Sequence, residues 1–94
     1  MPRLPKPTIS IIGTGRLGTA LALALNRTGY RVVGLVARRH RKAENAAKRL
    51  GKQRGVALAG RNLQRLPESD VILICTPDDE IESVVDRLLE QAKA

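Results

Sequence analysis

The fold is decided by one stretch near the start of the chain, Thr8-Ile9-Ser10-Ile11-Ile12-Gly13-Thr14-Gly15-Arg16-Leu17-Gly18. Residues 8–12 are mostly β-branched, which is typical of a strand. Residues 13–18 form the pattern GxGxxG, and the residues from Arg16 to Thr28 predict an apolar helix that ends before Gly29. A strand that runs through three glycines into a helix indicates the first half of a βαβ unit.

The three glycines have distinct steric roles in such a unit, which typically binds a dinucleotide. Gly13 allows a tight turn, Gly15 lets the backbone approach a pyrophosphate, and Gly18 lets the helix pack closely on the strand. The unpaired amides at the helix start, among them those of Arg16 and Leu17, would then face the phosphates. Because glycine inside a helix costs about 0.5–1 kcal/mol relative to alanine, Gly18 indicates a steric need. The alternative is a tight turn that binds nothing.

The rest of the chain alternates between strands and helices. Strands are predicted at 31–36, 56–58 and 70–75, helices at 39–50 and from Pro77 onward, and a short helical turn at 62–66. This order predicts an α/β fold, a Rossmann-like parallel sheet of about four strands with flanking helices. With the order 3-2-1-4, the fourth strand has an open edge that invites pairing with another chain. Residues 1–7, with three prolines, are expected to be a mobile tail before a domain of residues 8–94.

Charge is distributed unevenly along the chain. Residues 1–65 contain fifteen Lys or Arg and one acid, whereas residues 66–94 contain two basic residues and eight acids. We therefore expect the first two-thirds of the chain to meet an anion.

The basic run Arg38-Arg39-His40-Arg41-Lys42 follows Ala37 at the end of the second predicted strand. The helix dipole disfavours cations there, at the start of a helix, so an anion is expected among them. A dinucleotide fold recognises the ribose hydroxyls of NAD with an acid at this point, or the 2′-phosphate of NADP with arginine. No acid is present, which predicts NADP over NAD, with Arg38 and Arg39 as the best ligands of the phosphate. The alternative is a solvated basic patch.

The end of the fourth predicted strand, Cys75-Thr76-Pro77, lies at the edge where open α/β sheets bind ligands. Thr76 either caps the last helix, with Pro77 at its first position, or contacts the ribose beside the nicotinamide, and the two roles are compatible. Cys75 is expected to face the core, since no histidine is positioned to activate it as a nucleophile.

The composition excludes several classes of protein. The 94 residues suffice for one domain, and their single aromatic residue, Tyr30, leaves the core to aliphatic side chains. No apolar run approaches the roughly 18 residues that a membrane span needs. One cysteine and one histidine, His40, form neither a disulfide nor a closed zinc site. A platform for single-stranded nucleic acid is excluded because stacking aromatics are missing, and nucleic acid in general is not the expected partner.

Three segments together resemble the N-terminal NADP-binding domain of the 6-phosphogluconate-dehydrogenase-like superfamily: Ile11 to Leu21, Val32 to Gly34 with Arg38, and Asp70 to Ile81. Pyrroline-5-carboxylate reductases and prephenate dehydrogenases belong to it, and a group of uncharacterised Rossmann-like oxidoreductases is the most similar. The resemblance implies that the three glycines hold the pyrophosphate, that Arg38 meets the 2′-phosphate, and that Thr76 and Pro77 line the nicotinamide side. The family often has small hydroxyl residues where this chain has Ala37 and Arg39.

The same resemblance implies that further strands and a helical substrate domain would follow residue 94. The expected function is therefore to bind NADP or NADPH and to position the nicotinamide for hydride transfer with a substrate held by a domain absent here. No catalytic or metal-binding residue is assigned, so turnover by this chain alone is not expected. The predicted cofactor-binding residues are Gly13, Thr14, Gly15, Arg16, Leu17, Gly18, Ala37, Arg38, Arg39, Cys75, Thr76 and Pro77.

Two alternatives belong to other functional classes: a stand-alone module that senses a nucleotide or binds a partner, and a basic nucleic-acid binder. The absence of a targeting segment in the sequence predicts the cytoplasm. The open fourth-strand edge predicts pairing with another chain, which includes formation of a homo-oligomer.

Overall fold

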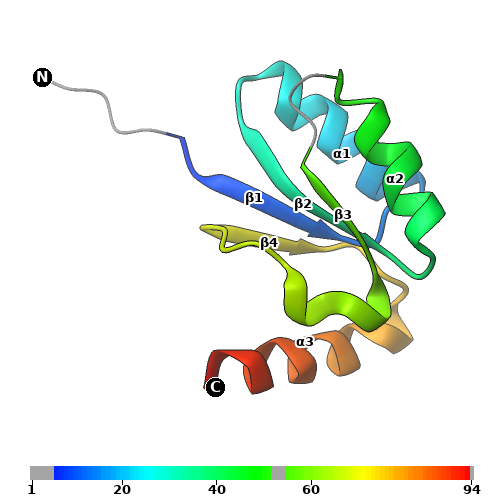
Figure 1. Cartoon of the computed structure of the whole chain (residues 1–94), viewed down its shortest axis with the longest axis vertical. Coiled ribbons are helices and arrows are strands. Elements are labelled where there is room, and N and C mark those ends of the chain that lie inside the picture. Colours follow the sequence, from blue (N-terminus) through cyan, green and yellow to red (C-terminus); the bar gives the residue numbers. More distant parts are fainter. Residues whose placement is uncertain (1–5, 52–54, 94) are drawn as a thin grey trace, which may run out of the picture.

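A computed structural model describes residues 6–51 and 55–93, whose helices and strands alternate along the chain (Figure 1). Every predicted element is found within two residues of its expected bounds. The elements are β1 (Thr8–Ile12), α1 (Arg16–Arg27), β2 (Arg31–Ala37), α2 (His40–Lys48), β3 (Val56–Ala59), the 3₁₀ segment η2 (Gly60–Arg65), β4 (Val71–Ile74) and α3 (Asp78–Lys93).

The four strands form one parallel sheet, which confirms the predicted fold class, and their order is β3-β2-β1-β4. Because the sheet is parallel, the carboxyl ends of all four strands meet at the same edge. The segments that follow β1, β2 and β4 begin at Gly13, Arg38 and Cys75. The topology therefore brings the three predicted parts of the site to one edge of the sheet.

Helices α1 and α2 cover one face of the sheet, and α3 with η2 covers the other (Figure 1). On the first face, Ile11 and Leu35 are fully buried and pack with small residues of the two helices, such as Ala22 and Ala47. Alanines let a helix approach a sheet closely, so an apolar core forms without aromatic side chains. On the second face the buried cluster contains Ile12, Val36, Leu58 and Leu63, with Val84 and Leu88 of α3 against it.

The edge strand β4 is less buried than its sequence suggests. Val71 and Ile72 are each 38% exposed, although they belong to the uninterrupted apolar run of residues 71–75. The reason is topological, because no strand pairs with β4 on its outer side within the described residues. Leu89 of α3 is also exposed.

At the amino ends of the strands, away from the predicted site, β1 and β4 are joined by reciprocal hydrogen bonds. The Thr8 amide donates to Asp70 Oδ2 at 2.9 Å, and the Asp70 amide donates to the Thr8 carbonyl at 3.0 Å. Thr8 and Asp70 also border an open polar depression of about 440 Å³. These contacts fix the register of β4 against β1.

Of the predicted tail, residues 1–5 lie outside the described residues, so the tail stays a prediction. Lys6 is described: its Nζ donates to the Thr28 carbonyl and lies 4.9 Å from the centroid of the Tyr30 ring. Among the described helices, none has the length and apolar character needed to cross a membrane.

Candidate functional site

Gly13 makes the turn from β1 toward α1 directly against the end of β4. Its φ of +99° lies in the region that favours glycine, and its amide donates to the Val36 carbonyl at 2.7 Å. A Cβ at this position would lie 2.8 Å from the carbonyl carbon and oxygen of Cys75. The Cys75 amide in turn donates to the Ile12 carbonyl at 2.7 Å. The turn therefore requires glycine both for its conformation and for the proximity of β4.

Gly18 and Gly15 have opposite surroundings. A Cβ at Gly18 would lie 1.8 Å from the Gly13 carbonyl oxygen and 3.5 Å from Ile11 Cγ2, so the first turn of α1 packs directly on the loop. A Cβ at Gly15 would meet no atom within 4 Å, and φ at Gly15 is an ordinary −67°. Nothing in the described fold requires glycine at position 15. The empty space beside its backbone fits the predicted close approach of a ligand.

The first turn of α1 is the positive end of the helix dipole, and neither a side-chain cap nor an acidic residue neutralises it. Gly15 is the N-cap and supplies no side-chain hydrogen bond, and the first turn contains no acid. The first hydrogen bond of the helix runs from the Thr19 amide to the Gly15 carbonyl at 2.9 Å, so the amides of Arg16, Leu17 and Gly18 precede it. Unpaired amides and the helix dipole together favour an anion at this point.

Two buried hydroxyl oxygens near the loop have no hydrogen-bond partner among the described residues: Thr14 Oγ1 and Thr76 Oγ1. A buried polar group without a partner costs roughly 1–3 kcal/mol. One of the two alternatives for Thr76 is therefore wrong, because its hydroxyl does not cap α3. Pro77 also precedes α3 rather than occupying its first position, and its carbonyl accepts from the Glu80 amide at 2.8 Å. The described residues therefore leave both hydroxyls without a hydrogen-bond partner.

The side chains of the basic run after β2 contact different elements of the fold. Ala37 ends the strand and is buried, Arg39 is the exposed N-cap of α2, and Arg38 between them extends toward α3. Arg38 Nη2 lies 3.1 Å from Oε1 of Glu80, in the first turn of α3. His40 faces Glu44 on its own helix, with 4.0 Å between His40 Nε2 and Glu44 Oε2.

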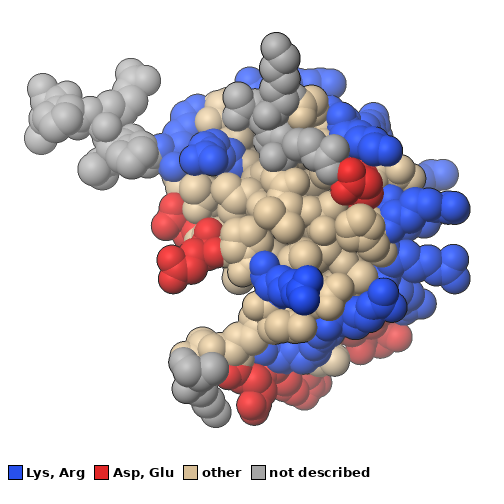
Figure 2. Space-filling model, viewed as in Figure 1, with Lys and Arg blue, Asp and Glu red and all other residues tan. Residues whose placement is uncertain are grey.

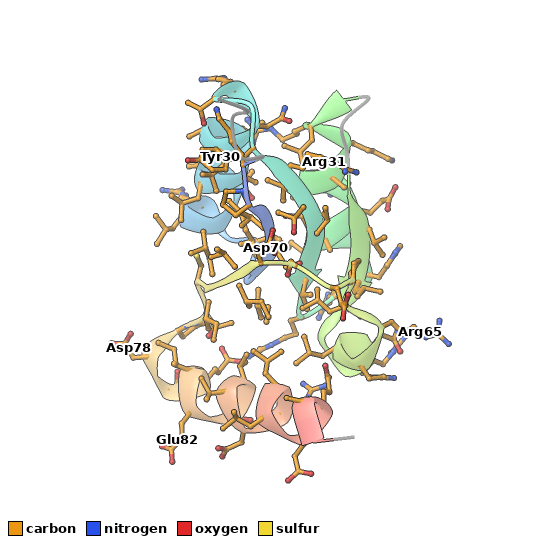
Figure 3. All side chains as sticks on the ribbon, turned by 90° about the vertical axis from the view of Figure 1, so that its left-hand side faces the viewer. Tyr30, Arg31, Arg65, Asp70, Asp78 and Glu82 are labelled. Atoms are coloured by element: carbon orange, nitrogen blue, oxygen red, sulfur yellow. The ribbon has the colours of Figure 1, made fainter. Side chains whose placement is uncertain are left out.

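Sequence reasoning missed the carboxylate of Glu80. It stands in an acidic first turn with Asp78 and Asp79, where interaction with the helix dipole explains all three acids equally well. Figure 3 shows Asp78 at the start of α3, and Glu82 pointing away from the sheet. The contact between Glu80 and Arg38 joins residues 42 positions apart and has no local sequence signal.

Cys75 packs against the buried cluster on the α1 and α2 side of the sheet and is itself half-buried. Its burial raises the pKa of the thiol, so the neutral thiol dominates at physiological pH. The described residues contain no group of three or more His, Cys, Asp or Glu side chains that could hold a metal ion.

Residues 8–94 match the model of a protein family described as NADP oxidoreductase, coenzyme F420-dependent. The chain belongs to this family. Together with the fold, membership indicates a dinucleotide-binding domain of the oxidoreductase type, and it confirms the resemblance to an N-terminal NADP-binding Rossmann domain. No curated protein sequence is significantly similar to the chain.

A solved structure with a similar fold is UDP-N-acetylglucosamine 3-dehydrogenase GnnA from Acidithiobacillus ferrooxidans. The two share 20% sequence identity with a TM-score of 0.71, and the match covers 95% of this chain. It covers 28% of the GnnA chain, so the present chain spans little more than a quarter of that protein. At 20% sequence identity, this similarity establishes the fold alone.

The two glycines with opposite surroundings predict opposite effects of alanine on stability. Gly18→Ala should lower the free energy of unfolding by about 1–3 kcal/mol, because its Cβ would overlap the Gly13 carbonyl. Gly15→Ala should change that free energy by less than about 0.5 kcal/mol, because its Cβ would enter open space. Urea denaturation followed by circular dichroism measures both, and equal losses would contradict the packing described here.

Cys75 should react with iodoacetamide more slowly in the folded chain than in the unfolded chain at pH 8. The thiolate is the reactive form, and burial raises the pKa of the folded thiol, so less thiolate is present before unfolding. The difference should shrink as the pH rises through the folded pKa. The chain has one cysteine, so the mass gain reports this residue alone. The matched control is the same chain in concentrated urea, and equal rates would refute the prediction.

Proposed function

We propose that this chain binds NADP(H) along the carboxyl edge of its sheet, prefers it to NAD(H), and orients the nicotinamide for hydride transfer. The observation that carries the proposal is the combination of an uncapped α1 start with open space at Gly15. The helix end carries about half a unit of positive charge, and its first amides are unpaired. A pyrophosphate is the part of a dinucleotide that suits this environment.

The preference for NADP rests on the two arginines that follow β2. Arg38 and Arg39 are exposed, and Ala37 before them offers no polar side chain to a ribose hydroxyl. A guanidinium binds a phosphate through two parallel hydrogen bonds, which the unphosphorylated ribose of NAD cannot accept in the same way. The description of the family, which names NADP, supports this choice.

The nicotinamide half of the cofactor would meet the residues around the end of β4. Thr14 and Thr76 supply buried hydroxyls without partners, which suit polar groups of the ribose or carboxamide. Cys75 and Pro77 border the same segment. The bound cofactor would supply the hydride, while the residues of this chain bind and orient it. The substrate would be held by another domain, consistent with the short span of this chain relative to GnnA.

Figure 2 shows the electrostatic setting of the proposal: basic residues gather on the side where α2 and η2 lie, and acids gather along α3. The exposed basic residues of α2, its caps and η2 are Arg39, Arg41, Lys42, Lys48, Arg49, Arg61 and Arg65. In Figure 3, Arg65 points into solvent, away from the sheet. A field of this sign would attract an anionic cofactor from a distance and raise its association rate at low salt.

Arg38→Ala should weaken NADPH binding about tenfold and leave NADH binding nearly unchanged. The loss corresponds to one strong hydrogen-bonded charge contact with the 2′-phosphate. Titration by calorimetry gives both dissociation constants. The matched control is Arg49→Ala, which removes the same charge at the far end of α2. Equal affinity of the unaltered chain for NADPH and NADH would refute the proposed preference, and binding of neither would refute the function.

We also propose that the outer edge of β4 pairs with a second copy of the chain. Its support is the unpaired strand itself, with Val71 and Ile72 both partly exposed. An exposed apolar edge strand presents a row of free backbone groups, which a further strand can satisfy.

If the edge pairs, the sedimentation coefficient of the chain should rise with concentration. Ile72→Lys should then shift the monomer toward higher concentrations, because a charge on an edge strand opposes pairing. Val56→Lys on β3, the other edge of the sheet, is the matched control, since Val56 is also partly exposed. A chain that stays monomeric at all accessible concentrations would contradict the pairing.

A further inference from the structure

An ion pair bridges two segments of the proposed cofactor site. Arg38 follows β2, Glu80 lies in the first turn of α3, and Arg38 Nη2 is 3.1 Å from Glu80 Oε1. The sheet order puts β1 between β2 and β4, so the pair crosses the end of β1 beside the glycine loop. The Arg38 side chain is 82% exposed and that of Glu80 38% exposed, so solvent and ligands reach both.

The fold thereby supplies an acid that the sequence after β2 lacks. In dinucleotide-binding sheets, a carboxylate near the end of the second strand accepts hydrogen bonds from the ribose hydroxyls of NAD. Here the second strand is followed by arginines, and the carboxylate arrives from α3 instead. Arg38 is a residue type that binds the phosphate of NADP, and Glu80 is one that binds a ribose hydroxyl of NAD. The two side chains contact each other.

We propose that Glu80 is a specificity-determining residue that lowers the preference for NADP(H) over NAD(H). This inference rests on the proposed function. The Glu80 carboxylate competes with the 2′-phosphate for the Arg38 guanidinium, and its negative charge repels the phosphate. The same carboxylate can accept a hydrogen bond from the 2′-hydroxyl of the NAD ribose, which carries the phosphate in NADP. All three effects shift the ratio of the two affinities in the same direction.

The size of the effect follows from the exposure of the pair. Exposed ion pairs contribute little, because solvent and salt screen them. Their contribution corresponds to roughly a two- to fivefold change in a binding constant. That range is smaller than the tenfold effect expected for loss of Arg38 itself. Glu80 therefore tunes the preference, whereas Arg38 creates it.

The experiment compares Glu80→Gln with the unaltered chain in titrations with NADPH and with NADH. The substitution keeps the length and shape of the side chain and removes its charge. The ratio of the two dissociation constants should move toward NADPH by about two- to fivefold at low salt. High salt should reduce the shift, because it screens exposed charges.

Asp79→Asn is the matched control, because it removes the same charge from the same helical turn. The ion pair of Arg38 is with Glu80 and not with Asp79. The control should shift the affinity ratio less than Glu80→Gln does. An equal shift in both variants would overturn the inference, since the cause would then be the general charge of the turn rather than the contact.

Combining Glu80→Gln with Arg38→Ala isolates the contact. Without Arg38, the substitution of Glu80 should raise the NADPH affinity by less than it does in the unaltered chain, because only the direct repulsion between carboxylate and phosphate is then relieved. An unaltered chain that binds neither nucleotide would overturn the proposed function and this inference together. A chain that prefers NADPH through Arg38, but whose preference is unchanged or reduced by Glu80→Gln, would overturn the inference alone.

Discussion

At the carboxyl end of β1, three backbone segments lie closer together than side chains permit. The Gly13 turn lies against the Cys75 carbonyl of β4, and the first turn of α1 lies against the Gly13 carbonyl at Gly18. These contacts fix the path of the chain from β1 into α1 and the position of β4 beside it. The uncapped start of α1 is consequently directed at the edge of the sheet where β2 and β4 also end.

The same close packing explains why the glycine loop has two kinds of glycine. Gly13 and Gly18 are required by contacts within the fold, whereas the space at Gly15 is empty. A glycine costs conformational entropy wherever it stands, so one without a packing role points to a different constraint. The approach of an anion to the backbone at the positive end of a helix is such a constraint, and it agrees with family membership.

The carboxyl ends of the strands lie between a basic region at the start of α2 and an acidic region at the start of α3. The start of α2 carries several cations at the positive end of its dipole, an arrangement that is unfavourable without an anion. The start of α3 carries three acids at the corresponding position, where they stabilise the helix. Arg38 and Glu80 join the two regions directly. The balance between these opposite charges, rather than the basic residues alone, is what a bound ribose would encounter.

The sequence by itself determined the elements, the parallel fold class and the glycine loop, because these follow from local patterns and their alternation. Periodicity, β-branching and GxGxxG all act over a few residues, and right-handed crossovers then restrict the topology. The tertiary structure alone decided that Thr76 leaves α3 uncapped, that β4 stays partly exposed, and that Glu80 meets Arg38. Each of these depends on which strands are neighbours and on side-chain directions across the sheet edge, and contacts between residues 42 positions apart leave no periodic signal in the chain.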